Sequence, residues 1–401
     1  MRHVVVAGAG IGGLAVAIAL RQRGFRVTVL ERAASTGERT GAALGVQSNA
    51  ALALAELGVA DAVLPAGVQV EEYVLRSWRG RELARWSPGA VGRELGAPNV
   101  TVPRQVVLGA LRSEVPEVRL GATVVGVVER PQQVSAVLAD GSTVDGDLLV
   151  GADGMGSAVR SALLGADEPP ARYAGYTAWR GVAEVTTDSL RAGVAAHFFG
   201  AGATFGMWPL PGERAYWVAT RAVPVTSTLD LAQLRKDFAG APDPVPLLLE
   251  RTGSALRTPI FDRDRIPRWH GGRTVLIGDA AHPMQPTTGQ GAGQALLDAL
   301  ALPAALSTVD WEDARSVRAG LARYAASRAG AAQVAAEARQ IGGMQHVPNR
   351  PAALVRNLVL RLTPASVWQR RAANRLDELD LLREVRNGRT SEGAQAWSDT
   401  Q

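Results

Sequence analysis

The stretch that decides the fold is Arg2-His-Val-Val-Val-Ala-Gly8-Ala-Gly10-Ile-Gly-Gly13. An apolar run that favours a buried strand passes directly into a glycine-rich turn, after which an apolar helix and a second strand are expected. Gly8 permits a tight turn, Gly10 lets a pyrophosphate approach the backbone, and Gly13 lets helix and strand pack closely. The second strand closes on Glu31, whose carboxylate can accept hydrogen bonds from ribose hydroxyls. The arrangement predicts a dinucleotide-binding fold.

A second glycine-rich segment reads Gly278-Asp-Ala-Ala-His-Pro-Met-Gln-Pro-Thr-Thr-Gly-Gln-Gly-Ala-Gly-Gln-Ala-Leu-Leu-Asp298. It follows a short buried-strand pattern and opens a long helix. Asp279 can accept hydrogen bonds from hydroxyls. Gly289, Gly291 and Gly293 bare the backbone at a helix N-terminus, where free N–H groups and the helix dipole favour negative charge. The segment therefore predicts a site for a flat ligand with a polyol chain. The alternative, an ordinary connection, would not need three costly glycines in the opening of a helix.

A third loop, Gly151-Ala-Asp153-Gly154-Met-Gly156-Ser157, also joins a strand to a helix, which Ser157 would cap. We expect it at the same crevice, with a plain turn as the alternative. A helix starting after Pro103 would place Arg104 at its entrance, where it could hold a phosphate or ribose; a solvated arginine is the alternative. Three such loops exceed what a nicotinamide dinucleotide needs, whereas FAD would use all of them.

Composition excludes several classes of protein. The chain has 401 residues, no cysteine and five histidines. Disulfides, thiolate nucleophiles and cysteine-bound metals are thus excluded, and the histidines lack metal-ligand spacing, so we expect no metal. The net charge is +5, but basic residues are scattered, which does not indicate a nucleic-acid surface. No apolar run reaches membrane-spanning length. A cleaved signal would remove the first strand, so we expect a cytoplasmic protein without membrane association.

The middle of the chain predicts a separate sheet. Residues 117–150 suggest a small antiparallel run with a turn at Asp140-Gly141. From Tyr173 to Thr220, aromatic-rich segments predict three to five strands with one face over a pocket. Long alanine-rich helices follow, one of them expected over Trp311–Ala336. We expect an FAD-binding domain from residues 1–172 and 257–340, a sheet domain from 173–256, and a helical tail from 341–401. The tail helices should dock on the protein, a membrane-surface role being the alternative.

These motifs resemble the single-component flavoprotein monooxygenases of the para-hydroxybenzoate hydroxylase type, especially the salicylate-hydroxylase-like branch. The resemblance covers roughly residues 1–340, with the three glycine motifs in the family's order. It implies an α/β fold: a glutathione-reductase-like, FAD-binding Rossmann domain with an inserted mixed β-sheet substrate domain and C-terminal helices. It also implies NAD(P)H reduction of the flavin, O2 addition at the flavin C4a carbon as a hydroperoxide, and oxygen transfer to an electron-rich carbon.

The resemblance implies roles residue by residue. The first motif would bind the ADP part of FAD, Asp153-Gly154 would serve both FAD and NAD(P)H, and Gly278-Asp279 with His282-Pro283 would hold the ribityl chain. The segment from Pro286 to Gly293 would lie against the flavin ring. The expected FAD-binding set is Gly8, Gly10, Ile11, Gly12, Gly13, Glu31, Arg32, Arg104, Val124, Asp153, Gly154, Arg160, Asp279, Pro286, Gly289, Gly291, Ala292 and Gly293.

Two departures from the family bear on the chemistry. Gly293 and Leu297 stand where many relatives carry asparagine and glutamate. The substrate strand, where phenol hydroxylases often place a histidine or tyrosine, is mostly apolar from Thr204 to Trp208. The candidate catalytic residues are His197, Arg180, Tyr216 and Pro286, and the candidate pocket residues are Thr204, Met207 and Trp208. A role as pocket wall or core is the alternative for His197, Arg180 and Tyr216.

The substrate expected from this pattern is an aromatic or polyketide-like small molecule, with an alkene for epoxidation as an alternative. A hydride-transferring flavoenzyme of the same fold is a further alternative, as is a nucleotide-binding regulatory protein without catalysis. The expected partners are the small molecule and O2, with the chain as a monomer or homodimer.

Overall fold

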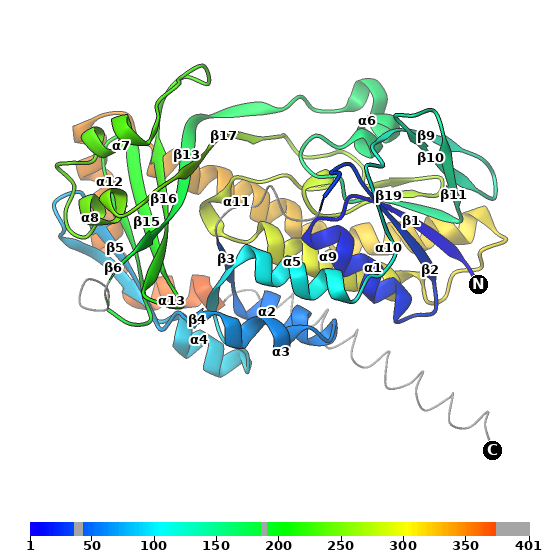
Figure 1. Cartoon of the computed structure of the whole chain (residues 1–401), viewed down its shortest axis with the longest axis horizontal. Helices are drawn as coiled ribbons and strands as arrows, with labels where there is room; N and C mark the ends of the chain where they lie inside the picture. The colour runs from blue at the N-terminus through cyan, green and yellow to red at the C-terminus, as the bar shows by residue number, and fades with distance from the viewer. Residues whose placement is uncertain (36–42, 186–190, 374–401) are drawn as a thin grey trace.

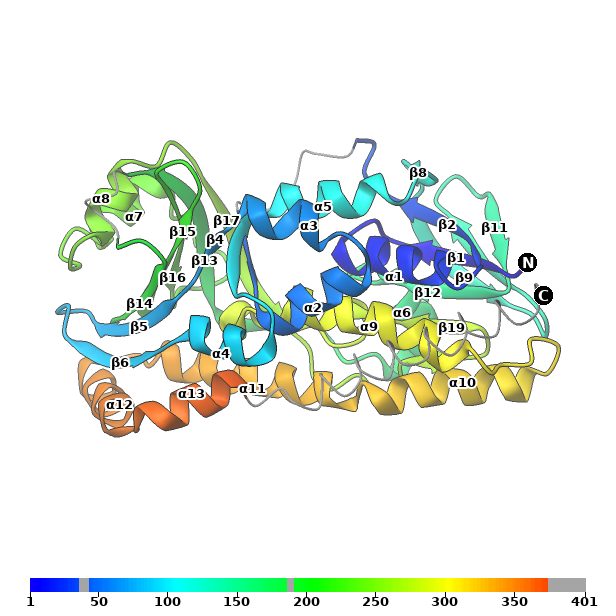
Figure 2. The same ribbon diagram turned by 90° about the horizontal axis from the view of Figure 1, so that it is seen from below.

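The computed structural model describes residues 1–35, 43–185 and 191–373. Two large sheets lie side by side along the long axis of the molecule, and the helices α10 (Ala314–Ser327) and α11 (Ala329–Gln345) run beside both (Figures 1 and 2). The first sheet contains the N-terminal strand, and the second contains the aromatic strands of the middle of the chain.

The first sheet is the expected Rossmann sheet. Within the described ranges, it has six strands in the order β18-β19-β12-β1-β2-β8, all parallel except β18. Their bounds are β1 His3–Ala7, β2 Arg26–Glu31, β8 Val118–Leu120, β12 Leu148–Gly151, β18 His270–Gly271 and β19 Thr274–Leu276. The helices α1 (Ile11–Arg21) and α9 (Gly291–Leu306) pack closely, because a Cβ on Gly12 of α1 would lie only 3.2 Å from the Ala295 Cβ of α9. A Cβ on Gly278, which precedes α9 in the chain, would lie at the same distance from that atom.

The antiparallel sheet expected over residues 117–150 covers a shorter part of the chain than predicted. Only β9 (Val124–Glu129), β10 (Val134–Leu138) and β11 (Thr143–Gly146) form an antiparallel sheet. The strands at either end of the run, β8 and β12, join the parallel sheet instead. For β12 the reason is visible in its sequence, because four consecutive buried residues suit a strand covered on both faces.

The second sheet has seven strands among the described residues, in the order β17-β13-β16-β15-β14-β5-β6. It is mixed, because β14 and β5 are parallel while the other neighbours are antiparallel. The bounds are β5 Glu72–Ser77, β6 Glu82–Trp86, β13 Arg172–Glu184, β14 Val194–Phe199, β15 Ala203–Leu210, β16 Arg214–Arg221 and β17 Ala255–Asp262. Two strands thus come from residues before 173, outside the range expected for the sheet domain, and we propose that β5 and β6 belong to that domain.

The two faces of this sheet have different neighbours. One face packs Trp179, Phe205 and Trp217 against the short helices α7 (Leu231–Asp237) and α8 (Val245–Glu250). The opposite face, called the inner face below, carries Tyr216 and Leu210, which pack against Ala43 of β3 (Ala43–Val46). The strand alternation of period two therefore aims one set of side chains at the first domain.

The remaining elements connect these layers. Their bounds are α2 Ser48–Glu56, α3 Ala60–Val63, η1 Leu64–Ala66, β4 Val68–Gln69, α4 Pro88–Leu95, β7 Val100–Pro103, α5 Arg104–Ser113, α6 Ala158–Leu164, η2 Gly165–Asp167, η4 Gly278–Ala280, η5 Pro286–Thr288, α12 Arg350–Leu362 and α13 Ala365–Ala373. The helix expected over Trp311–Ala336 is divided at Arg328, whose side chain is buried. Across the described part of the chain, no helix combines the length and apolarity needed to span a membrane.

Candidate FAD and substrate site

The first glycine turn has the geometry that its residues predict. Gly8 has a φ of +103°, and its N–H donates to the Leu30 carbonyl at 2.7 Å. A Cβ on Gly8 would lie 2.5 Å from the Ala152 oxygen, and one on Gly13 would lie 1.8 Å from the Gly8 oxygen. These two positions require glycine for the fold itself. A Cβ on Gly10 would meet nothing within 4 Å, so its exposed backbone is open to a ligand.

The carboxylate of Glu31 is held at the end of β2, next to this turn. Its Oε2 accepts a hydrogen bond from Ala9 N–H at 2.8 Å, and its Oε1 accepts one from Ala33 N–H at 2.9 Å. Each carboxylate oxygen has a second lone pair, so both can still accept from ribose hydroxyls. Arg32, also assigned to FAD, follows as an exposed side chain, and Val124 begins β9 and packs against the first domain's core.

Gly10→Val separates ligand binding from folding. We expect the free energy of unfolding of the flavin-free variant to stay within about 0.5 kcal/mol of the parent, because the added side chain meets open space. We expect FAD affinity to fall about tenfold, because the side chain occupies the space needed by a pyrophosphate. Urea unfolding and flavin titration measure the two quantities. Equal FAD affinity in variant and parent would contradict the assignment.

The Asp153 loop is built around a helix start. The Asp153 Oδ2 accepts hydrogen bonds from Ala158 N–H at 2.8 Å and Val159 N–H at 3.2 Å, and Ser157 caps α6 through Arg160 N–H at 2.9 Å. The Asp153 Oδ1 is buried without a partner among the described residues, and burial raises the pKa of this carboxyl. An unpaired buried acceptor is costly, which fits a site that a ligand donor completes.

Arg160 joins two loops that are distant in sequence. The side chain is fully buried, and its Nε donates to Glu168 Oε1 at 2.8 Å. Its Nη2 donates to the Met155 carbonyl at 2.7 Å, and its Nη1 donates to the Ala280 carbonyl at 3.2 Å. Because the protein uses all three nitrogens, we propose that Arg160 positions the loops for FAD rather than touching it.

Asp279 lies in η4, at the end of the strand β19. Asp279 is exposed, whereas its neighbours Gly278 and Ala280 are buried. Burial nevertheless raises the pKa of Asp279, against the opposing charges of His282 and Arg104. An accessible carboxyl that is also strongly desolvated lies in a recess: solvent reaches it, while protein surrounds it.

The N-terminus of α9 faces the same recess. A Cβ on Gly291 would lie 3.9 Å from Asp279 Oδ1, and the N-cap residue Gln290 makes no side-chain capping bond. The start of this 16-residue helix therefore lies near Asp279, and the free N–H groups of such a start can interact with negative charge on a ligand. Pro286 and Gly289 are exposed, Gly291 and Ala292 are partly buried, and Gly293 is buried.

A buried ionic network fixes this loop from below. Asp298 is fully buried; its Oδ2 accepts from Gly278 N–H at 2.7 Å and lies 2.6 Å from His282 Nε2. Its Oδ1 accepts from Arg328 Nε at 2.7 Å. Burial alone would raise the pKa of Asp298, but the charges of His282 and Arg328 lower it to about 2. The carboxylate is therefore ionised and joins η4, α9 and the end of α10. The sequence analysis placed no function on Asp298 or Arg328.

The inner face brings two candidate catalytic residues to the FAD residues. Arg180 on β13 interacts with the Tyr216 hydroxyl on β16, and burial raises the pKa of Tyr216 while Arg180 and Arg104 oppose the rise. Burial lowers the pKa of Arg104. The charges of Asp279 and Tyr216 raise it, and the charge of Arg180 lowers it further. Residues from α5, η4, β13 and β16 thus converge at one place. The sequence analysis assigned each of the four, but not their proximity.

His197 lies farther along the inner face, inside an aromatic cluster. Its ring stacks on Phe199 at 4.8 Å between centroids and meets the edge of Trp208 at 6.4 Å. Its Nδ1 lies 3.4 Å from the Tyr73 hydroxyl, and its Nε2 is buried without a partner among the described residues. Burial lowers the pKa of His197 to about 3, so the ring is neutral at pH 7. We assign it to the pocket wall rather than to proton transfer.

The three candidate pocket residues do not share a face. Trp208 lies on the inner face, at 5.7 Å from the Tyr216 ring. Thr204 is on that face too, but it is buried and its hydroxyl bonds with Thr220 at 2.7 Å. Met207 packs on the opposite face, beneath α7 and α8. Side chains alternate between the two faces along β15, which explains the difference. Met207 therefore does not line the pocket.

Acid should weaken the contact between the sheet and α11 through His346. The Nε2 of His346 accepts from Thr220 Oγ1 at 2.7 Å when Nδ1 donates to the Gly342 carbonyl at 2.8 Å. Burial lowers the pKa of His346 from 6.5 to about 4, so the unfolded chain binds the proton first. The contribution of His346 to stability should be intact above pH 6.5 and fall by on the order of 2–3 kcal/mol as pH drops to 4, beside a separate fall from His197, whose pKa is also lowered by burial. Urea unfolding against pH measures this. The fall should shrink in His346→Gln; an equal fall would contradict the assignment.

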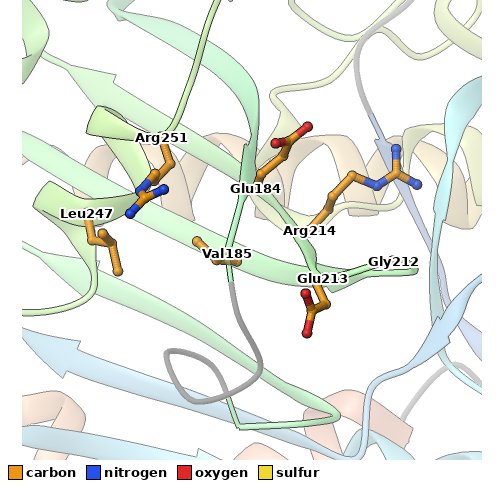
Figure 3. A pocket seen from close by; sticks show the side chains of 7 residues that line it. All are labelled: Glu184, Val185, Gly212, Glu213, Arg214, Leu247 and Arg251. Carbon is orange, nitrogen blue, oxygen red and sulfur yellow. The ribbon is translucent and has the colours of Figure 1, made fainter.

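A separate hollow of about 300 Å³ lies where β13 ends and β16 begins in the second sheet (Figure 3). Its lining residues come from the end of β13, the turn before β16 and the helix α8; they are Glu184, Val185, Gly212, Glu213, Arg214, Leu247 and Arg251. None of the three glycine-rich loops reaches it, so we do not place the FAD or substrate site there. Among the described residues, no group of three or more imidazoles and carboxylates could hold a metal ion.

The chain is similar to several known proteins. The family described as "FAD binding domain" matches residues 1–339. Aurachin C monooxygenase/isomerase of Stigmatella aurantiaca is 40% identical over 367 residues, which cover 90% of this chain and 94% of the relative. 3-Hydroxybenzoate 6-hydroxylase 1 of Aquipseudomonas alcaligenes is 34% identical over 319 residues, 75% of this chain and 79% of the relative. The crystal structure of Klebsiella pneumoniae HpxO with FAD and uric acid has a TM-score of 0.83 at 27% identity and covers 96% of this chain and 97% of that one.

Proposed function

This chain belongs to the FAD-binding-domain family of FAD-dependent monooxygenases and hydroxylases, and on that basis we propose that it uses NAD(P)H and O2 to insert one oxygen atom into an aromatic or polyketide-like small molecule. The chain is an FAD-dependent monooxygenase. The observation that carries the substrate proposal is the convergence of Arg104 and Asp279 with Arg180 and Tyr216. Relatives named for aurachin C and 3-hydroxybenzoate support an aromatic substrate.

The residues present fit FAD. The open backbone at Gly10 suits a pyrophosphate, Glu31 can accept from ribose, and the unpaired Asp153 oxygen awaits a donor. Asp279 and the N-terminus of α9 would hold the ribityl chain and the flavin ring. When bound, FAD supplies the electrons and the site at which O2 is activated.

Arg180 and Tyr216 would orient the substrate on the inner face. The raised pKa of Tyr216 keeps its hydroxyl protonated at neutral pH, so it can donate a hydrogen bond to a substrate oxygen. The adjacent Arg180 guanidinium would favour the ionised form of that oxygen, which makes the ring more electron-rich before oxygen transfer. Trp208, His197 and Phe199 would form an apolar wall that keeps water out, and Pro286, which is exposed, would lie at the flavin side of the recess.

Tyr216→Phe should lower kcat about tenfold, because one hydrogen bond to the reacting molecule is lost. FAD content should be unchanged, since Tyr216 lies on the substrate sheet. Steady-state turnover and the flavin absorbance of the purified variant measure the two effects. Met207→Leu, on the opposite face of the same sheet, is the matched control and should keep the parental kcat. An unchanged kcat in Tyr216→Phe would remove this residue from the site.

A panel of substrates tests the proposed function. NAD(P)H oxidation is followed with catalase present, and peroxide release is measured in separate assays without catalase, using hydroxybenzoates, hydroxyquinolines and larger polycyclic phenols. We expect at least one compound to accelerate NAD(P)H oxidation without peroxide release. If every compound yields peroxide in full equivalence to NAD(P)H, the aromatic-substrate proposal is wrong. Epoxidation of an alkene by the same flavin chemistry is the second candidate, because the wall around Trp208 is largely apolar.

A further inference from the structure

The helix α12 carries an apolar stripe that the protein does not cover. Its docked side is narrow, with Ala353, Arg356 and Leu360 as its buried residues. The opposite side exposes between 55% and 72% of each of five aliphatic residues: Leu354, Val355, Leu358, Val359 and Leu362. Figure 2 shows α12 at the edge of the molecule, beneath β5 and β6. The expectation that this helix simply docks therefore accounts for fewer than half of its apolar residues. A contiguous exposed patch of this kind marks an interaction surface.

The charge around the stripe has one sign. Residues 350–373 contain five arginines and no aspartate or glutamate. With about 3.6 residues per turn, Arg350 and Arg361 fall beside Leu354 on one border of the stripe. Both are exposed, and Arg370 of α13 is exposed as well. On the neighbouring strand β6, Glu82 is paired with Arg85, so it does not offset these charges. The surface thus combines an aliphatic stripe with unneutralised cations.

We propose that α12 docks on an anionic lipid surface, with its aliphatic stripe in the acyl boundary and Arg350, Arg361 and Arg370 at the headgroups. A second copy of the chain fits less well, because an isologous contact would bring the same arginines face to face. A protein partner also fits less well, because the stripe is convex and lacks the aromatic anchors typical of protein interfaces. A bilayer needs neither shape complementarity nor aromatic anchors.

The test is flotation of the full-length, FAD-loaded protein with two kinds of vesicle. One is pure phosphatidylcholine, and the other is phosphatidylcholine with roughly 30–40 per cent phosphatidylglycerol, which makes it strongly anionic. We expect binding to the anionic vesicles only, weakened by 0.5 M salt (about a twofold shorter screening length than at physiological strength). Val355→Glu/Leu358→Glu should abolish it, and Arg361→Gln should weaken it about fivefold. Val125→Glu, an exposed apolar residue on β9, should bind like the parent.

Two results would overturn the proposal. One is no binding of the full-length protein to anionic vesicles. The other is a dimer, seen by light scattering, that Val355→Glu/Leu358→Glu converts to monomer while vesicle binding is unaffected by the substitutions. Flavin absorbance and circular dichroism of each variant keep folding separate from binding. A failure here leaves the monooxygenase assignment unchanged, because the test does not depend on turnover.

Discussion

Asp298→Ala is expected to lower the free energy of unfolding of the flavin-free protein by about 3–5 kcal/mol, the range for breaking a buried ion pair. The substitution leaves the Arg328 guanidinium, whose side chain is only 4% exposed, without its carboxylate. It also removes the acceptor for Gly278 N–H and the partner of His282. Three elements, η4, α9 and the end of α10, lose their common anchor.

Urea unfolding followed by circular dichroism measures the effect on protein stripped of flavin. Asp298→Asn is the control, since the amide oxygen can still accept one hydrogen bond and should recover part of the loss. If Asp298→Ala unfolds at the parental urea concentration, the buried network is not what fixes the flavin loop. If neither variant folds, limited proteolysis of Arg328→Lys gives a milder test of the same contact.

Asp279→Ala is expected to act on the ligand instead of the fold. The carboxyl is accessible and accepts no hydrogen bond from the described residues, so its removal should leave flavin-free stability within about 0.5 kcal/mol. FAD affinity should fall about a hundredfold, because charge-assisted hydrogen bonds to ligand hydroxyls contribute about 1.5–3 kcal/mol each. Flavin titration by fluorescence quenching measures the affinity.

Asp279→Asn should lose less affinity, because it keeps an acceptor but loses the charge. A purified Asp279→Ala protein with undiminished flavin content would contradict the assignment of this residue to the ribityl chain. The predictions for the two aspartates are therefore opposite, although both residues belong to the segment from Gly278 to Asp298. Loss of Asp298 should lower the stability of the fold, and loss of Asp279 should lower the affinity for FAD.

The first domain could be predicted from sequence because its signals are local. Gly8, Gly13 and Glu31 lie within one strand–turn–helix–strand unit, and their backbone requirements follow from short-range sterics. The second sheet was predicted in kind but not in extent, since β5 and β6 join it across more than a hundred residues. No local pattern encodes that pairing. By contrast, the separation of Met207 from Trp208 follows from strand alternation alone, but the predicted pocket treated the strand as one continuous patch.

The site residues divide in the same way. Asp279 and Gly291 can be recognised in the glycine-rich segment of the sequence. The residues that fix the position of this segment cannot be recognised in the same way. Tyr176 donates to Gln285 Oε1 at 3.0 Å, and Gln285 Nε2 donates to the buried carboxylate of Asp262 at 2.7 Å. Arg339 also donates to Asp262, from a helix 77 residues later in the chain. Such networks depend on tertiary contacts between ordinary polar residues, and a single sequence contains no period or motif that reveals them.

The central claim is that this protein transfers one oxygen atom from O2 to its substrate. The direct measurement is turnover under ¹⁸O2 with NAD(P)H and the best compound from the substrate panel, followed by mass spectrometry of the product. We expect a product that carries one ¹⁸O atom, formed by protein that retains FAD. A product that contains no ¹⁸O, formed at the rate of NAD(P)H oxidation, would instead identify a hydride-transferring flavoenzyme and contradict the account.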